Sequence, residues 1–298
     1  MTFWKILRVL TTDACNYRCP YCQNEGQIKK QGNFLRLNDF IKIFDEIRKT
    51  PITEIRFSGG EPLTNPDTIK MIEYVYNNSE LEIGLATNAS LITEDVAEKL
   101  AKLNVLVTVH LPAIESDVYE FITGKSFESF KNAVQILKDK NVNFSFNHVL
   151  YPATKKYLKE ILKSDFIRGR RLKLLPYLES DFKNLSQEII FEVKKILAEL
   201  SFSESSTQTA NAIFFFASDD TRIKLIKSPC YTANLNSCKS YAEVRLLPNL
   251  EFQRCIFDNR YYKIDMSDCN VVSILSEMWA SFNRCYRIFG SEKVFITQ

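Results

Sequence analysis

The segment Asp13-Ala-Cys-Asn-Tyr-Arg-Cys-Pro-Tyr-Cys22 is the part of the sequence around which the rest of the chain is organised. It places Cys15, Cys19 and Cys22 in a C-x3-C-x2-C arrangement within eight residues. So short a loop is a poor frame for disulfides between its own cysteines, but it can wrap three thiolates around one iron–sulfur cube. Four-iron clusters usually take four cysteines, so three at this spacing leave one iron for a ligand that is not protein. A zinc-binding loop is the alternative interpretation.

A second motif, Gly59-Gly60-Glu61-Pro62, directly follows an expected strand at residues 54–58. The chain contains only eight glycines, so two in succession indicate a need for backbone without side chains. Such glycines allow the backbone to approach a ligand closely. In a parallel sheet the carboxyl ends of the strands share one edge, which is where ligands bind. The sequence therefore predicts that this motif and the cysteine loop lie together.

Short β-rich runs alternate with amphipathic helical runs from about Lys5 to Lys173. Strands are expected at residues 6–12, 54–58, 81–87, 105–111, 144–150 and 173–176. The helices between them include one with Asn38 as its N-cap, one at 93–103 and one at 127–138. Six βα units in succession imply a parallel sheet with right-handed crossovers. The predicted fold class is α/β: a partial (β/α)6 TIM-like barrel with a small C-terminal β-hairpin and helix region.

Composition sets limits on compartment and partners. The chain has 298 residues, 45% of them hydrophobic, and 39 basic against 36 acidic residues give a net charge of +3. No bulk charge favours nucleic acid or a membrane surface, and no apolar run approaches the ~18 residues of a membrane span. Eight cysteines without a secretory leader favour metal ligation over disulfides. We expect a reducing cytoplasm, with no nucleic-acid and no membrane partner.

The two motifs together resemble the radical S-adenosylmethionine (radical SAM) superfamily. The resemblance implies that SAM chelates the open iron of a [4Fe–4S] cluster and is cleaved reductively to methionine and a 5'-deoxyadenosyl radical, which takes a hydrogen atom from the substrate. An external electron donor of the flavodoxin or ferredoxin type is implied as a partner. Catalytic and metal-binding roles fall on Cys15, Cys19 and Cys22. The residues expected to contact SAM are Tyr21, Gly59, Gly60, Glu61, Pro62, Thr87, Asn88, His110, Asn147 and Leu175. For Thr87 and Asn88 a helix cap before Thr93 is the alternative, and for Leu175 a plain core position.

A polar run, Ser201–Ala210, is the one convincing boundary in the chain. We therefore expect a barrel at 1–200 and a C-terminal auxiliary-cluster region at 211–298. A β-hairpin is expected at 243–254, turning at Pro248-Asn249. The cysteines around it, Cys230, Cys238 and Cys255, suit a second [4Fe–4S] cluster with three protein ligands, and Cys269 is the candidate fourth. Buried reduced thiols are the alternative for all four, and the favoured interpretation for Cys285.

Across most of its length the chain also resembles the GTP cyclase family of molybdenum-cofactor biosynthesis. The matching segments are 7–16, Arg56-Phe-Ser-Gly-Gly-Glu-Pro-Leu63, Phe121-Ile-Thr-Gly-Lys125 and the hairpin from Arg245 to Phe257. The resemblance implies that Arg8, Arg56 and Arg245 lie near the substrate. His110 stands where that family has a serine that meets SAM, and Asn147 matches a family asparagine. For His148, as for His110, the alternatives are a polar substrate contact, a proton-transfer group and a capped structural histidine.

The departures from that family are as informative as the matches. Glu243 and Glu54 stand at positions that are basic in the cyclase, and the sequence ends Ile296-Thr-Gln298 instead of Gly-Gly. Two reversals of charge in a triphosphate pocket should remove much of the binding. We therefore expect a peptide or natural-product precursor as substrate, with nucleotide cyclisation as the alternative. A non-catalytic iron–sulfur or zinc carrier or sensor is the alternative of another class.

Overall fold

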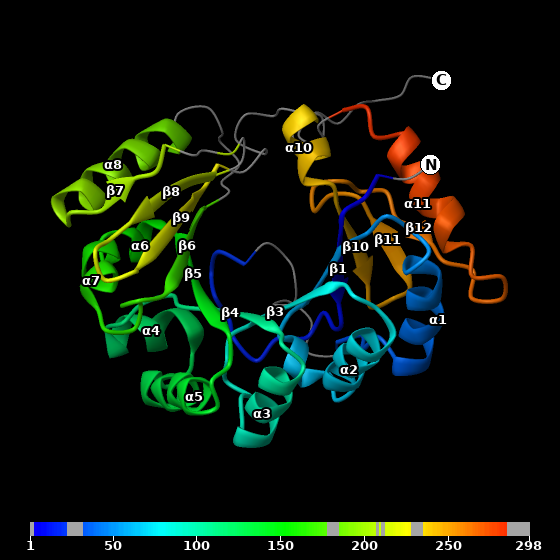
Figure 1. Ribbon diagram of the computed structural model, residues 1–298, viewed down its shortest axis with the longest axis horizontal. Coiled ribbons are helices and arrows are strands. Elements are labelled where there is room, and N and C mark those ends of the chain that lie inside the picture. Colours follow the sequence, from blue (N-terminus) through cyan, green and yellow to red (C-terminus); the bar gives the residue numbers. More distant parts are fainter. Residues whose placement is uncertain are drawn as a thin grey trace.

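The computed structural model describes residues 3–22, 32–177, 185–206, 209, 212–227 and 235–284. Its centre is a single curved sheet whose described strands follow the order β12-β11-β10-β1-β2-β3-β4-β5-β6-β9-β8-β7 (Figure 1). The helices lie outside this sheet, and the strands curve around a central space. Cys230 and Cys285 fall outside the described residues.

The six predicted strands are present, and all neighbours from β1 to β6 pair in parallel. They are β1 (Ile6–Leu10), β2 (Glu54–Ser58), β3 (Glu82–Thr87), β4 (Leu106–His110), β5 (Phe144–Leu150) and β6 (Arg171–Pro176). The helices of this half are α1 (Leu37–Ile47), the 3-10 turn η1 (Pro62–Thr64), α2 (Thr68–Asn78), α3 (Glu94–Lys102), α4 (Ser116–Thr123), α5 (Phe127–Asp139), α6 (Pro152–Lys155) and α7 (Leu158–Lys163). The partial barrel expected from the βα alternation is therefore confirmed.

The rest of the chain extends both edges of the same sheet. Beyond β6 lie β9 (Arg222–Ile226), β8 (Ala212–Phe216) and β7 (Ser203–Glu204), and α8 (Leu185–Glu199) precedes them in the chain. Beyond β1 lie β10 (Glu243–Leu247), β11 (Glu251–Gln253) and β12 (Tyr262–Lys263), accompanied by α10 (Leu235–Tyr241) and α11 (Val271–Ala280). The expected hairpin at 243–254 is present as antiparallel β10 and β11. Because β10 pairs in parallel with β1, the sheet continues across the expected division between 200 and 211.

The two faces of the sheet differ in chemistry because side chains alternate along each strand. The residues facing the helices form the core, with Leu7, Phe57, Val107, Phe146 and Leu172 each at most 1% exposed. Their neighbours in the chain point into the concave side and are mostly polar or charged. The concave face therefore carries the chemistry, and the helix-facing side carries most of the burial energy.

Helix boundaries follow local capping in part. Thr93 caps α3 by accepting a hydrogen bond from Val96 N at 3.3 Å, and Ser126 caps α5. The prediction of Asn38 as an N-cap is wrong, because α1 begins at Leu37 with Arg36 in the cap position. None of the helices in the described part combines the length and hydropathy needed to cross a membrane.

Candidate functional site

The cysteine loop leaves the carboxyl end of β1 and brings its three thiols close to one another. Cys15 Sγ accepts a hydrogen bond from Tyr17 N at 3.4 Å, and Cys22 N donates to Cys19 O at 3.1 Å. Burial, together with the neighbouring Cys15 and Cys22, raises the pKa of the Cys19 thiol to about 12. Three thiols that disfavour one another's ionisation need a nearby positive centre before they can act as thiolates.

The geometry does not suit a single metal ion. Within the described residues, no three His, Cys, Asp or Glu side chains are placed to hold one. Thiolates around a single zinc lie about 3.7 Å apart, because each Zn–S bond is about 2.3 Å long. An iron–sulfur cube holds its ligands farther apart than that. The described cysteines are thus not arranged around a single zinc ion in this structure.

The loop is held by polar contacts that the sequence did not reveal. Asn16 Nδ2 donates to Ser90 Oγ at 2.7 Å, and Asn88 Nδ2 donates to Asn16 Oδ1 at 2.8 Å. Tyr17 and Tyr119 share a buried hydrogen bond between their hydroxyls at 2.8 Å. Residues between two ligand cysteines are thus tied to the end of β3 and to α4. No spacing pattern marks these partners, since they meet only across the folded sheet.

Gly59 and Gly60 are required by the backbone of the cysteine loop itself. A Cβ atom on Gly59, whose φ is +142°, would lie 2.3 Å from Thr12 O, and one on Gly60 would lie 2.0 Å from Ala14 O. Gly60 N and Glu61 N instead donate to these two carbonyls at 2.9 and 2.8 Å. The glycine pair therefore joins the end of β2 to the start of the cysteine loop. The two predicted motifs do lie together.

Glu61 links the same region to the end of β3. Its carboxylate, 1% exposed, accepts hydrogen bonds from Thr87 Oγ1 at 2.8 Å and from Asn88 N at 2.7 Å. Burial raises its pKa to about 7, against the lowering effect of these donors. The Thr87 and Asn88 side chains are thus engaged in fixing Glu61 and Asn16. A role for these two side chains in touching SAM stays a prediction.

Three of the predicted site residues form one hydrogen-bonded row. The Tyr21 hydroxyl lies 2.7 Å from His110 Nε2, and His110 Nδ1 lies 2.8 Å from Asn147 Oδ1. An amide oxygen only accepts, so Nδ1 carries the proton and Nε2 accepts from Tyr21. Burial lowers the pKa of His110, which keeps the ring neutral. The row connects the cysteine loop to β4 and β5 on the concave side, where half-buried Leu175 also lies.

His148 does not join that row. Its side chain is 0% exposed and lies on the helix-facing side of β5, with Nδ1 donating to Leu111 O at 2.9 Å. Burial lowers its pKa to about 4. The expectation that His148 contacts substrate is corrected by this placement, because adjacent strand residues point to opposite faces. His148 is the capped structural histidine of the alternative interpretation.

The expected substrate arginines lie on the concave face and are paired with acids. Arg8 donates to Glu243 through Nε at 2.7 Å and Nη2 at 3.0 Å. Arg56 donates to Glu243 Oε2 at 3.2 Å and to Glu54 Oε2 at 2.8 Å, and its Nη1 also contacts Tyr241. Burial acts to raise the pKa of Glu243, but the charges of Arg8 and Arg56 hold it at about 2. The two carboxylates that depart from the cyclase pattern therefore neutralise the two arginines that match it.

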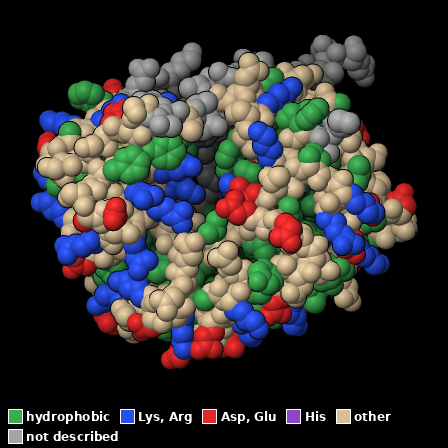
Figure 2. All heavy atoms as spheres, viewed as in Figure 1, with side chains coloured by type: hydrophobic (Ala, Val, Ile, Leu, Met, Phe, Trp, Pro, Cys, Tyr) green, Lys and Arg blue, Asp and Glu red, His purple; other side chains and the backbone are tan. Residues whose placement is uncertain are grey.

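Figure 2 shows a hollow in one face of the molecule, with Lys and Arg side chains on one side of it and Asp and Glu side chains on the other. Arg245 adjoins the paired arginines in register, because Arg245, Arg8 and Arg56 are Cα partners across β10, β1 and β2. Lys173 on β6 and Lys224 on β9 stand on the concave face as well. Neither lysine is among the site residues predicted from the sequence, although the alternation of polar and apolar residues in their strands was an available signal.

Comparison with known proteins bears on this arrangement. A sequence profile of the Radical SAM superfamily matches residues 9–164, which include the cysteine loop, the Gly-Gly-Glu-Pro segment and the row from Tyr21 to Asn147. The chain belongs to the radical SAM superfamily. It is therefore an enzyme of a family that uses a [4Fe–4S] cluster and SAM.

Curated radical SAM relatives include GTP 3',8-cyclases. That of Clostridium botulinum is 36% identical over 142 residues, which are 44% of this chain and 43% of the relative. A probable GTP 3',8-cyclase of Methanococcus aeolicus is 24% identical over 294 residues, covering 95% of this chain and 93% of the relative. The match thus spans less than half the length of the Clostridium cyclase.

Solved structures share the fold. Streptococcus suis SuiB bound to S-adenosylmethionine has a TM-score of 0.68 at 15% identity, covering 90% of this chain and 65% of that one. The protein anSMEcpe with bound AdoMet and the Cp18Cys peptide has a TM-score of 0.62 at 15% identity, covering 97% and 91%. At such identities the likeness concerns the fold alone, and it agrees with a radical SAM partial barrel.

The donor set of this radical SAM chain fits the cluster that the family uses. Cys15, Cys19 and Cys22 are free thiols of one loop, and Cys15 and Cys22 lie close enough to Cys19 to act on its ionisation. The backbone at Gly59 and Gly60 carries no side chain beside this loop. The assignment of individual SAM contacts stays a prediction.

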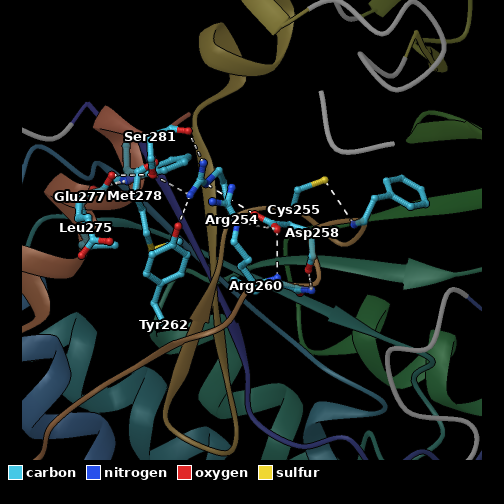
Figure 3. Close-up of polar contacts among 12 residues, drawn as sticks. Arg254, Cys255, Asp258, Arg260, Tyr262, Leu275, Glu277, Met278 and Ser281 are labelled. Atoms are coloured by element: carbon cyan, nitrogen blue, oxygen red, sulfur yellow. Dashed lines mark hydrogen bonds and ion pairs between the residues drawn. The ribbon is translucent and has the colours of Figure 1, made fainter. Parts of the chain in front are cut away.

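The described C-terminal cysteines, Cys238, Cys255 and Cys269, lie in different local surroundings. Cys255 follows β11, and its Sγ accepts a hydrogen bond from Phe257 N at 3.4 Å (Figure 3), which repeats the contact of Cys15 with Tyr17 N. Cys269 lies elsewhere, with its thiol donating to Lys42 O of α1 at 3.4 Å. Cys269 is half-buried, and its role as a fourth ligand stays a prediction.

The loop that carries Cys255 is anchored by a buried arginine. Arg254 has a side chain 0% exposed and lies 3.9 Å from the carboxylate of Asp258, itself 2% exposed. It also donates to Ser281 O at 2.8 Å and Ser281 Oγ at 3.0 Å, and contacts the Tyr262 hydroxyl (Figure 3). Asp258 N donates to Cys255 O at 2.9 Å, which closes the turn. Arg254 thus ties the cysteine turn to the end of α11.

Proposed function

We propose that this radical SAM enzyme generates a 5'-deoxyadenosyl radical and uses it to take a hydrogen atom from a substrate bound on the concave face. The cluster and SAM supply the radical chemistry when bound, and the protein supplies binding, orientation and exclusion of water. Cys15, Cys19 and Cys22 would hold the cluster. An external donor of the flavodoxin or ferredoxin type would deliver the electron.

The residues of this chain have separable tasks in that reaction. The glycine pair and Glu61 would hold the cysteine loop against β2 and β3, where its thiols would bind the cluster. The row of Tyr21, His110 and Asn147 would orient the bound nucleoside with hydrogen bonds from neutral groups. A row without ionised side chains is suited to this task, because it places no charge beside the bound nucleoside.

The substrate that we propose is a peptide or natural-product precursor, not GTP. The observation that carries this proposal is the pairing of Arg8 and Arg56 with Glu243 and Glu54. A triphosphate needs arginines whose guanidinium N–H groups are available to donate hydrogen bonds. Each carboxylate placed among these arginines repels the triphosphate. Breaking part-buried ion pairs to bind a phosphate would cost about as much as the new contacts return.

An auxiliary cluster held by Cys230, Cys238 and Cys255 is part of the proposal. It would bind the substrate or carry an electron. Support comes from Cys255, whose sulfur accepts an amide hydrogen bond in the manner of Cys15. Hydrogen bonds to cluster sulfurs tune reduction potentials, so such a contact is expected at a ligand thiolate.

Nucleotide cyclisation is the second candidate. The match to a probable GTP 3',8-cyclase over 95% of the chain favours it. The basic residues Arg8, Arg56 and Arg245 are retained at the expected places. This candidate requires that Glu54 and Glu243 move away from the arginines when the nucleotide binds.

The test of the reaction type is anaerobic reconstitution with iron and sulfide, followed by dithionite and SAM. We expect formation of 5'-deoxyadenosine and methionine by the native chain. The Cys22→Ala variant should form none, while Cys269→Ala should form as much as the native chain. A native protein that binds iron and leaves SAM intact would make it a carrier or sensor.

The test of the substrate class uses the same protein with GTP, and in parallel with a precursor peptide encoded beside the gene. We expect GTP to leave the rate of 5'-deoxyadenosine formation unchanged and to yield no cyclised nucleotide. Accumulation of a cyclised nucleotide would establish the second candidate instead. Peptide-dependent product of altered mass would support the first.

A further inference from the structure

Two lysines face each other on the wall of the concave face opposite the paired arginines. Lys173 on β6 and Lys224 on β9 are Cα partners across adjacent parallel strands. The residues on either side of each lysine are buried on the opposite face of the sheet: Leu172, Leu174, Ile223 and Leu225. Because side chains alternate along a strand, both lysines point to the concave side. Like charges directly across a sheet are destabilising. The pair therefore needs a compensating negative charge.

That compensation is missing from the contacts of the described residues. No ion pair among them joins Lys173 or Lys224 to a carboxylate, whereas Glu54 and Glu243 are bound to Arg8 and Arg56. Burial, together with the charges of Arg56, Lys224 and Arg8, lowers the pKa of Lys173 to about 8. Glu54 is the acidic group that acts on both lysines, without an ion pair to either. Lys224 also lies over the Phe214 ring, 5.5 Å from its centroid.

We propose that Lys173 and Lys224 together bind one oxyanion of the substrate, a carboxylate or a phosphate monoester. The inference rests on the proposed function only in taking the oxyanion from the substrate. A single anion between two ammonium groups would remove their mutual repulsion and accept several of their six N–H donors. Lysines suit a compact charge, because each ammonium acts as a point charge without the fork geometry of arginine.

The position of the pair suits substrate recognition. Lys173 is the Cα partner of Asn147, which holds His110, so a bound oxyanion would lie beside the row that starts at Tyr21. On the opposite wall, Arg8 and Arg56 are already paired with Glu243 and Glu54. The two lysines, by contrast, have no ion pair to a carboxylate among the described residues, so they are the cations placed to receive a single negative charge. This arrangement fits a substrate with one localised anionic group better than a polyphosphate.

The test is competitive trace acetylation of the full-length, cluster-reconstituted protein, with the extent of modification of each lysine read by mass spectrometry. Inorganic phosphate and succinate are the probes in separate arms, and SAM is a third arm. At a probe concentration tenfold above its Kd, we expect the labelling of Lys173 and Lys224 to fall about tenfold. Other lysines should label unchanged. Whichever small anion protects identifies the oxyanion as phosphate or carboxylate.

Variants distinguish an anion site that needs both lysines from non-specific attraction of anions to nearby positive charge. In Lys224→Met, the small anion should no longer protect Lys173, and in Lys173→Met it should no longer protect Lys224. The matched control is Arg222→Gln, which removes the exposed cation two residues away that pairs in register with Arg171. Protection should persist in that control.

Three outcomes would overturn the proposal: no protection by either anion, protection that survives Lys224→Met, or protection by SAM alone, which would assign the pair to the cofactor. The labelling does not depend on turnover. A native protein that forms no 5'-deoxyadenosine would therefore refute the proposed function, and the lysine site would still be judged by its own protection pattern.

Discussion

Glu243 on β10 accepts hydrogen bonds from Arg8 on β1 at 2.7 and 3.0 Å, and a further one from Arg56 on β2 at 3.2 Å. One carboxylate thus binds the two arginines that the resemblance to GTP cyclases places near a triphosphate. These residues are neighbours only because β10 returns from the far end of the chain to pair with β1. The substrate wall is therefore closed by a segment more than two hundred residues from the cysteine loop.

Replacing Glu243 by Gln should make this wall attract polyphosphate. The change removes the charge that neutralises Arg8, so we expect GTP affinity to rise at least about tenfold, equivalent to about 1.4 kcal/mol. Isothermal titration calorimetry with GTP would measure it. The matched control is Glu82→Gln, an exposed acid in register with Glu54 on the neighbouring strand. Equal affinities in the variant, the control and the native chain would remove the support for a substrate other than GTP.

His148 should make stability depend on pH in mildly acidic solution. Its pKa is lowered from 6.5 to about 4 by burial, so the unfolded chain binds the proton more readily than the folded one. The stabilisation is complete above pH 6.5 and is lost as the pH falls towards 4, by about 3 kcal/mol in total. Asn can replace the Nδ1 donor to Leu111 O without titrating. Urea unfolding of native and His148→Asn protein should therefore converge as the pH falls from 7 to 4. Parallel curves would contradict this account.

Gly60→Ala should remove the cluster that the cysteine loop holds. The new Cβ would lie 2.0 Å from Ala14 O, so the loop backbone must shift next to Cys15. We expect loss of about four irons per chain after reconstitution and no cleavage of SAM. Gly84→Ala is the control, because its Cβ would lie 3.5 Å from the nearest heavy atom, an ordinary contact. Iron contents that are equal in the two variants would show that the close approach at Gly60 is dispensable.

Arg254→Met should weaken the turn that carries Cys255. The change removes the hydrogen bonds that Arg254 donates to Ser281, while Asp258 keeps its contact with Arg260. Leaving the buried acceptor at Ser281 O without its donor should cost about 1–3 kcal/mol in the free energy of unfolding. If Cys255 binds an auxiliary cluster, iron per chain should fall by about four while SAM cleavage without substrate persists. Arg260→Gln is the comparison, since Arg260 contacts the same carboxylate from an exposed position. A variant that keeps all its iron and its stability would show that Arg254 does not position this turn.

Much of the barrel could be predicted because its signals are local. The strand from Glu54 to Ser58 and the helix cap at Thr93 are recognisable from neighbouring residues alone, and the structure has both. The prediction of Asn38 as a cap was wrong because it also relied on a local signal alone. A polar residue near a helix start is a weak local signal, and the observed cap, Arg36, lies two residues before Asn38.

The candidate site contains features that neighbouring residues in the sequence could not predict. That Asn147 and His148 follow one another in a strand is visible in the sequence, but which of them faces the concave side depends on the register of β5 against β4. Cys269 likewise stands at the start of a helix in the sequence, and only the contact with Lys42 O places it beside α1.

By itself, the sequence determined the superfamily, the cofactor chemistry and the succession of βα units. Cysteine spacing, adjacent glycines and the periodicity of apolar residues are properties of short segments, so they are readable without the fold. Only the tertiary structure decided which polar and charged groups meet: Glu243 with Arg8, Glu61 with Thr87, and Lys173 with Lys224. Such pairs join residues far apart in the chain, and their energies depend on distance and burial, which the closing of the sheet alone sets.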